Sequence, residues 1–345
     1  MSSSLLLYAP NVHTGGGLVL LQALLRDWPV GHTLRAILDT RAIDKLVLPD
    51  QTQVLWTAAT LVSRFRAEWQ LATMAGSADT VLCFHGLPPL FRNRGRVVLF
   101  QQNRLLLGLM RLRDFPLRTG LRVAAERWIS RAFRCHVNEY IVQTPSMARA
   151  LTAWHGGSPQ VHVLAFSGLV AAQPRQTPVW DFVYVSDGLP HKNHARLLQA
   201  WALLAAEGIR PRLALTLGPR DQILANQVAK LVEQTGSQVH NLGHVEYQAA
   251  LALYASARAL VFPSLGESFG LPLIEARQAN LPILAPELDY VRDVCEPVQT
   301  FDATSSVSIA RAVKRFLQHA EPVPLPLPAR AFWAALGLQA GVTLP

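Results

Sequence analysis

Charged residues are scarce in this chain of 345 residues. Asp, Glu, Lys and Arg together make up 16% of it, and acids are the scarcer sign, with 23 against 32 Lys and Arg. Cysteine is rarer still, since Cys83, Cys135 and Cys295 are the three in the chain and lie far apart. Three separated cysteines exclude a disulfide framework and a cysteine-based metal cluster, and they suit a reducing compartment.

Long apolar runs and targeting segments are missing as well. No stretch of 18 or more apolar residues is free of charge, so we expect no membrane-spanning helix. The first residues lack the basic and apolar parts of a secretion signal, and we therefore expect a cytoplasmic protein. The sequence has no Asp-x-Asp pair, so no metal ion is expected, and no Gly-x-Gly-x-x-Gly, so hydride chemistry is not indicated.

Hydrophobic residues are abundant, at 50% of the chain, and their pattern predicts two α/β domains. Short apolar runs alternate with helical periodicity, as in doubly wound parallel sheets. Strands are predicted at 5–8, 33–38, 54–56, 80–84, 96–100, 140–144, 161–164, 182–185, 213–217 and 259–262, with helices at 18–28, 117–134, 145–154, 194–207, 222–235, 248–254, 272–280 and 305–319. We expect a first domain at 1–167, a linker at 168–178, a second domain at 179–320 and a proline-rich tail at 321–345 that one interpretation returns to the first domain.

The net charge of +9 belongs to the first half of the chain. Residues 1–170 contain 18 basic and 9 acidic residues, whereas residues 171–345 contain 14 of each. Residues 117–134 alternate arginines with apolar residues and Trp128, which is typical of a helix on an anionic membrane surface. The alternative is an ordinary surface helix whose apolar stripe packs into the core. No nucleic-acid-binding module accompanies the charge, so we expect a membrane surface and no nucleic acid as the partner.

One stretch near the end combines a strand, a glycine loop and a helix. An apolar run reaches Phe262, the loop contains Gly266 and Gly270, and a helix is predicted to begin near Pro272. Such a loop directs backbone N–H groups and a helix N-terminus at a bound phosphate or sugar. Glu267 and Glu275 flank this turn and would face different parts of one ligand. Alternatively both are solvated, because the helix dipole favours Glu in a first turn.

Two features of the first half occupy corresponding places after predicted strands. Gly15, Gly16 and Gly17 follow the first strand, where glycine permits close backbone approach to a ligand or merely a tight turn. His85 follows the strand at 80–84, and functional loops of open α/β sheets lie at such strand ends. A lone histidine there is also compatible with a structural role.

The stretch from Val261 to Leu284 resembles the Glu-x7-Glu signature of retaining glycosyltransferases of family 4, including the Ser-Phe-Gly-Leu-Pro between the two acids. The segment from Asp181 to Trp201, with His191, Lys192 and Asn193, resembles the family segment whose lysine contacts the donor diphosphate. This resemblance implies the GT-B fold, in which two Rossmann-like domains face each other across a cleft. The second domain would bind a nucleotide-sugar donor and the first an acceptor.

The resemblance also assigns roles to residues. His85, Lys192 and Glu267 would be catalytic, with Lys192 stabilising the leaving diphosphate and Glu275 binding the ribose hydroxyls. The implied donor-binding set is Gly15, Gly16, Gly17, Lys192, Asn193, Glu267, Ser268, Phe269, Gly270, Leu271 and Glu275. The chain departs from the family where an arginine commonly precedes the lysine, because Ser186 and Asp187 stand there. A second cation must come from elsewhere, with His191 and Arg220 as candidates.

The implied activity is retaining, metal-independent transfer of a hexose, with mannose as the preferred guess, and needs no cofactor. The donor is a nucleotide diphosphate sugar, and the acceptor is lipid-linked or an oligosaccharide in lipopolysaccharide O-antigen, capsule or exopolysaccharide biosynthesis. We expect the protein at the inner face of the cytoplasmic membrane. Two alternatives stay open, a sugar-nucleotide epimerase of the same fold and a non-catalytic membrane-associated binding protein.

Overall fold

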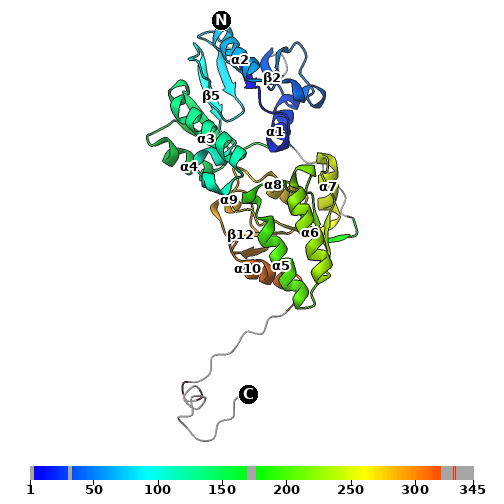
Figure 1. The fold of residues 1–345 in the computed structure, drawn as a ribbon. Coiled ribbons are helices and arrows are strands. Elements are labelled where there is room, and N and C mark those ends of the chain that lie inside the picture. The colour runs from blue at the N-terminus through cyan, green and yellow to red at the C-terminus, as the bar shows by residue number, and fades with distance from the viewer. Residues whose placement is uncertain (1–3, 30–32, 169–175, 320–328, 330, 332–345) are drawn as a thin grey trace.

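The computed structural model describes residues 4–29, 33–168, 176–319, 329 and 331. Figure 1 shows two α/β domains stacked end to end, with α1 of the first domain above α8 of the second. Most of the expected linker at 168–178 and of the expected tail at 321–345 lies outside the described residues. Among the described residues, none of the helices is long and apolar enough to span a bilayer.

The first domain is built on a parallel sheet of seven strands in the order β3-β2-β1-β4-β5-β6-β7. Its strands are β1 Leu5–Ala9, β2 Leu34–Asp39, β3 Gln53–Thr57, β4 Thr80–Cys83, β5 Arg96–Phe100, β6 Glu139–Val142 and β7 Val161–Val163. Its α-helices are α1 Gly15–Arg26, α2 Leu61–Met74, α3 Leu117–Ala132 and α4 Pro145–His155. In register, Leu5 of β1 pairs with Leu34 on one side and with Thr80 on the other.

The second domain repeats this winding with six parallel strands in the order β10-β9-β8-β11-β12-β13. Its strands are β8 Trp180–Tyr184, β9 Leu213–Leu215, β10 Val239–Asn241, β11 Ala257–Val261, β12 Ile283–Pro286 and β13 Gln299–Phe301. Its helices are α5 His194–Ala206, α6 Gln222–Thr235, α7 Tyr247–Ala255, α8 Leu271–Gln278, α9 Asp289–Arg292 and α10 Ser306–Phe316. The prediction of two doubly wound parallel sheets is confirmed.

Buried apolar side chains cover both faces of each sheet, as the continuous apolar strands require. In the first domain, α1 packs its leucines against Phe84 and Phe100, whereas Leu71 of α2 and Leu151 of α4 belong to the core on the other face. In the second domain Trp201 of α5 lies in the core, where its ring meets Phe182 edge-on at 5.6 Å.

Helix α3 does not bury its large apolar residues. Leu117, Leu121 and Trp128 are 79%, 64% and 66% exposed, while the buried positions are Gly120, Val123 and Ser130. The large residues of the apolar stripe therefore lie outside the core, whereas Val123 of the same helix packs into it.

The strand order of each sheet reverses direction at one place. The chain runs outward to one side from β1 and to the other side from β4, and it does the same from β8 and β11. In open α/β sheets ligands bind beyond the carboxyl ends of strands at such a switch point. The loops after these four strands are therefore the places to examine for a site.

Candidate active site

The residues predicted for the site occupy these four loops. Gly15–Gly17 follow β1, His85 follows β4, Lys192 follows β8 and Glu267 follows β11. The two switch points meet at the domain junction, since a Cβ added to Gly16 would lie 2.9 Å from Cδ1 of Leu271. The three glycines form the first turn of α1, which begins at Gly15 and not at Leu18 as predicted. Gly15 has a φ of +65°, which glycine adopts without strain.

Lys192 and Glu267 form an ion pair between the loops after β8 and β11. The lysine Nζ donates to Oε1 of Glu267 at 2.8 Å, and the two side chains are 15% and 10% exposed. Burial alone lowers the pKa of Lys192, but the carboxylates of Glu267 and Asp187 outweigh it, and the net pKa is raised. The lysine is therefore a held cation, and its ammonium group has three N–H donors, of which this ion pair uses one.

The backbone around Lys192 is fixed by its neighbours in the sequence. The 3-10 helix η5, Pro190–Lys192, ends at Asn193, which has a φ of +63° and precedes α5. The Asn193 side-chain amide donates to the carbonyl oxygens of Pro263 at 3.0 Å and Ala303 at 2.8 Å. Asn193 thus ties the lysine loop to the loop after β11, which is a structural use of a residue predicted to contact the donor.

Ser264 and Tyr290 support the Glu267 loop, and the sequence analysis did not assign either a role. The Ser264 hydroxyl donates to Oε1 of Glu267 at 2.6 Å, so this oxygen accepts two bonds. The Tyr290 hydroxyl donates to the Ser264 carbonyl oxygen at 2.6 Å. These bonds orient Glu267, and its second carboxylate oxygen accepts no hydrogen bond from the described residues.

The turn into α8 presents backbone donors. Gly270 has a φ of +72°, a conformation that favours glycine, and precedes a helix whose second residue is Pro272. Among the described residues, the amide N–H groups of Phe269, Gly270 and Leu271 donate to no protein acceptor. Unpaired N–H groups at a helix N-terminus attract anions, so this turn can bind a phosphate group. The adjacent Ser268 carbonyl oxygen accepts from the Thr144 hydroxyl at 3.3 Å.

Glu275 lies one turn into α8 and is 8% exposed. Its Oε2 accepts a hydrogen bond from the Tyr254 hydroxyl at 3.0 Å, and burial raises its pKa to about 6. A solvated surface carboxylate would not show this burial, so the alternative of a solvated Glu275 is wrong. The cost of burying a carboxylate without a cation points to a use for its remaining acceptor capacity.

His85 lies in the first domain, beside Tyr8, and takes no part in the ion pair of Lys192 and Glu267. Its ring meets the Tyr8 ring edge-on at 5.0 Å, and its buried Nδ1 has no hydrogen-bond partner. Burial lowers the pKa of His85 to about 4, so the imidazole is neutral at pH 7. Among the described residues, no hydrogen bond joins His85 to Lys192 or Glu267.

Further polar contacts close the junction, and sequence patterns could not reveal them because the partners are more than 100 residues apart. The Ser146 amide donates to Oδ2 of Asp293 at 2.8 Å, and Arg149 pairs with Asp289 at 2.8 Å. Arg104 Nη1 donates to the Glu267 carbonyl oxygen at 3.1 Å. The first domain therefore contacts both the Glu267 loop and α9.

The two candidates for a second cation differ in charge and exposure. His191 is buried, and burial and the neighbouring Lys192 lower its pKa, so its ring is neutral. Arg220 is exposed in the 3-10 helix η6, Pro219–Asp221. Among the described residues, no group of three or more His, Cys, Asp or Glu side chains is arranged to hold a metal ion.

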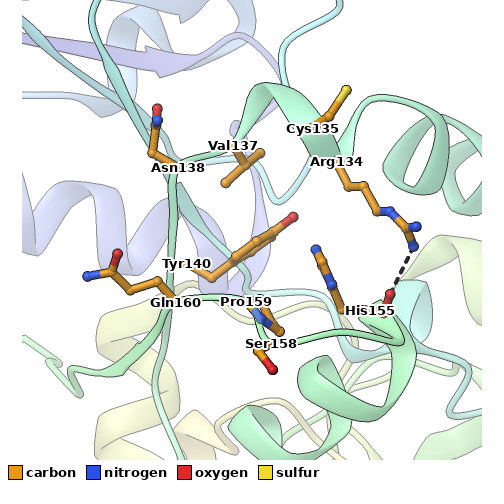
Figure 2. Close-up of a pocket in the computed structure, with 9 residues that line it drawn as sticks. All are labelled: Arg134, Cys135, Val137, Asn138, Tyr140, His155, Ser158, Pro159 and Gln160. Carbon is orange, nitrogen blue, oxygen red and sulfur yellow. Dashed lines mark hydrogen bonds between the residues drawn. The ribbon is translucent and has the colours of Figure 1, made fainter.

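A separate surface pocket of about 410 Å³ lies in the first domain (Figure 2). Asn138 and Gln160, which line it, immediately precede β6 and β7, so the pocket is at the amino ends of the strands. Arg134 crosses its rim and donates to the His155 carbonyl oxygen at 2.8 Å. The four loops of the candidate site lie at the opposite edge of the sheet, and the pocket is not part of that site.

Comparison with known sequences covers mainly the second domain. Residues 169–325 match the family described as Glycosyl transferases group 1. The serotype-specific mannosyltransferase WbdA of Escherichia coli is 32% identical over 149 residues, which are 41% of this chain and 18% of that protein. O-antigen chain mannosyltransferase B of Escherichia coli is 34% identical over 116 residues, 32% of this chain and 30% of that protein. The match thus spans less than a third of either relative.

Solved structures match nearly the whole chain. Sucrose-phosphate synthase from Thermosynechococcus elongatus has a TM-score of 0.65 at 16% identity, covering 92% of this chain and 90% of that one. HepE of Anabaena, solved with UDP and glucose, has a TM-score of 0.62 at 14% identity over the same two fractions, 92% and 90%. At such identities the likeness shows the fold, which is GT-B, as expected from the sequence.

Proposed function

We propose that the protein is a retaining glycosyltransferase, from the premise that residues 169–325 match the family described as Glycosyl transferases group 1. It moves a hexose, mannose in our proposal, from a nucleotide diphosphate sugar to a hydroxyl of a lipid-linked or polysaccharide acceptor. Its place is the assembly of lipopolysaccharide O-antigen, capsule or exopolysaccharide. The O-antigen mannosyltransferases among the relatives support the sugar and the pathway class.

The observation that carries the proposal is the set of groups around Lys192. The ion pair with Glu267, the free amides of Phe269, Gly270 and Leu271, and the buried Glu275 lie along one continuous loop and helix. These groups match the parts of a nucleotide sugar in order. Glu275 binds the ribose hydroxyls, the α8 N-terminus binds the diphosphate, and Glu267 faces the sugar.

The chemistry that we propose needs no carboxylate nucleophile and no metal ion. The bond between the sugar and the diphosphate breaks as the acceptor hydroxyl approaches on the same face. The new glycosidic bond forms on that face, which retains the anomeric configuration, and the leaving diphosphate oxygen takes the acceptor proton. Lys192 stabilises the negative charge that develops on the diphosphate, an electrostatic effect that removal of a single donor in other enzymes shows to be worth ~10²–10³-fold in rate.

The first domain contributes the acceptor side in this proposal. Gly16 and Gly17 allow the backbone of the first domain to approach the diphosphate. A side chain at Gly16 would instead meet Leu271, at the N-terminus of α8. His85 is neutral and lies at the end of β4, where a ring nitrogen can donate to the transferred sugar or accept from it without adding charge.

We also propose that the first domain docks on an anionic membrane from the cytoplasmic side. Leu117, Leu121 and Trp128 form an exposed stripe on α3, and the exposed Arg118 and Arg122 flank it. Such a helix buries its apolar face at the lipid boundary while its arginines meet lipid phosphates. This position would bring a lipid-linked acceptor to the junction.

The test is a transfer assay with GDP-mannose and other nucleotide sugars, with and without lipid-linked acceptors, followed by NMR of the product. The proposal predicts acceptor-dependent transfer with the anomeric configuration of the donor. Release of nucleotide and an epimerised sugar without acceptor would instead identify an epimerase. Binding of a nucleotide sugar without turnover in any combination would identify a binding protein.

A further inference from the structure

We infer that Arg104 of the first domain binds the donor diphosphate and is the second cation of the donor site. The inference rests on the proposed function, because it presumes a nucleotide diphosphate sugar at the junction. It assigns to the first domain the second positive charge, for which the second domain has Ser186 and Asp187 at the expected place.

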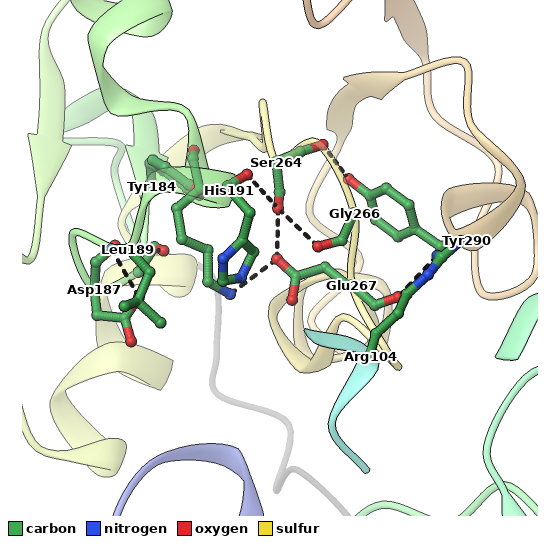
Figure 3. Close-up of polar contacts among 11 residues, drawn as sticks. Arg104, Tyr184, Asp187, Leu189, His191, Ser264, Gly266, Glu267 and Tyr290 are labelled. Carbon is green, nitrogen blue, oxygen red and sulfur yellow. Dashed lines mark hydrogen bonds and ion pairs between the residues drawn. The ribbon is translucent and has the colours of Figure 1, made fainter. Parts of the chain in front are cut away.

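Arg104 is held in reach of the Glu267 loop by its own backbone. It opens the 3-10 helix η2, Arg104–Leu107, just beyond the end of β5, and the Asn103 side chain caps this turn by accepting from the Leu105 amide. From there the Arg104 Nη1 crosses the junction to the Glu267 carbonyl oxygen at 3.1 Å (Figure 3). Lys192 therefore contacts the side-chain carboxylate of Glu267, and Arg104 contacts the backbone carbonyl of Glu267.

Arg104 forms no direct ion pair with the described residues. Its one hydrogen bond to the described residues goes to a neutral carbonyl, and none of their carboxylates lies within ion-pair distance. Asp289 and Asp293 are near, but they are bonded to Arg149 and to the Ser146 amide. Burial lowers the pKa of Arg104, although Tyr290 and these acids act in the opposite direction.

Arg104 is partly buried and keeps four further N–H donors, which an anion at the junction can meet. Phosphate oxygens fit the planar fork of arginine well. Free amides that can bind an anion, those of Phe269 to Leu271, begin two residues after Glu267, whose carbonyl oxygen Arg104 contacts. A diphosphate bound there carries more negative charge than Lys192 alone can balance.

Neither residue named as a second cation in the second domain is a buried cation. Ser186 and Asp187 stand where the family places an arginine, His191 is neutral, and Arg220 is exposed. Arg104 therefore makes the donor site bipartite. The diphosphate is fully contacted only when the two domains meet as they do here.

The experiment is isothermal titration of GDP and UDP, and of guanosine and uridine, into wild type and three variants, Arg104→Gln, Arg104→Lys and Arg149→Gln. Arg149→Gln is the matched control, since it removes an ion pair between the same two domains, to Asp289, without touching the Glu267 loop. Loss of a charge-assisted contact predicts that Arg104→Gln weakens the diphosphate about tenfold or more and leaves the nucleoside unchanged. Arg104→Lys should recover part of the loss, and Arg149→Gln should stay near wild type.

Three results would overturn the inference. Unchanged diphosphate affinity in Arg104→Gln, with only the KM for acceptor raised, would assign the arginine to the acceptor. Equal losses for nucleoside and diphosphate, or a similar loss in Arg149→Gln, would reduce Arg104 to a domain contact. If the wild-type protein bound neither GDP nor UDP nor any other nucleoside diphosphate, the proposed function would fail, and the inference with it.

Discussion

Replacing Glu275 by glutamine should stabilise the protein while weakening its binding of nucleotide. The change removes a buried charge but keeps a carbonyl oxygen that can accept the Tyr254 hydrogen bond. A carboxylate held in a dry site for a ligand costs folding free energy in the absence of that ligand. The two effects therefore have opposite signs and can be measured on the same variant.

The magnitude follows from the pKa of Glu275. Burial raises it from 4.5 to about 6, a difference that corresponds to about 2 kcal/mol. Because the folded-state pKa is the higher one, wild-type stability is greatest below pH 4.5, falls as pH rises through the interval to 6, and stays low above it. At pH 7.5 the variant should be more stable by up to about 2 kcal/mol, or about 4 to 8 °C in Tm.

The assay is thermal unfolding of wild type and Glu275→Gln between pH 4 and pH 8, paired with nucleotide titration at pH 7.5. The Tm difference should be full at pH 7.5 and vanish near pH 4.5. Two hydrogen bonds from ribose to a charged acceptor predict an affinity loss of about tenfold to a hundredfold. Glu287→Gln is the control, because that exposed carboxylate has a lowered pKa from its Arg292 partner and its removal should not stabilise.

Two results would refute this reasoning. A Tm difference that is independent of pH would show that the charge of Glu275 is not its cause. Unchanged nucleotide affinity in the variant would show that the buried carboxylate serves packing and not the ribose.

Three further predictions concern the ion pair, the glycine turn and α3. Lys192→Met should lower kcat by about a hundredfold or more while the protein stays folded, measured by transfer rate and circular dichroism, since it removes the cation beside the leaving group; a rate within threefold of wild type would exclude that role. Gly16→Val should raise the donor KM while the protein stays folded, because the valine side chain would meet Leu271. An unchanged KM would place the glycine turn away from the donor. Leu121→Gln with Trp128→Gln should abolish sedimentation with vesicles containing anionic phosphatidylglycerol and leave Tm within a degree or two; retained sedimentation would point to another docking face.

Much of the fold could be predicted because the signals are local. The strand at 96–100 and the helix at 222–235 were predicted with the bounds that the structure has, since apolar runs and capping residues lie within the elements themselves. The short elements α9 and β13 were missed because they have too few residues to show a period. Helix α2 was missed despite its 14 residues, because it buries only Ala67, Glu68 and Leu71 and so lacks a clear apolar stripe. The start of α1 was misplaced because glycine disfavours a helix interior but is tolerated in its first turn.

The candidate site divides in the same way. Glu267, Glu275 and Lys192 could be named from motifs on single loops, and the structure brings Lys192 and Glu267 to 2.8 Å. Arg104, Thr144 and Tyr290 could not be named, because their contacts join segments that only the docking of elements brings together. A sequence pattern records spacing along the chain, whereas a charge left unpaired at a domain junction is visible only in three dimensions.

The most direct test of the account is a thermal-shift screen of the wild-type protein with GDP, UDP, ADP, dTDP and CMP and their sugar conjugates, with and without EDTA. A ligand at about 100 times its Kd stabilises the folded state by about 2.7 kcal/mol. The account predicts a rise in Tm with one nucleotide and its sugar conjugate, unchanged by EDTA and reduced by about half or more in Glu275→Gln. No rise with any of them would contradict the assignment of a nucleotide-sugar site at the junction.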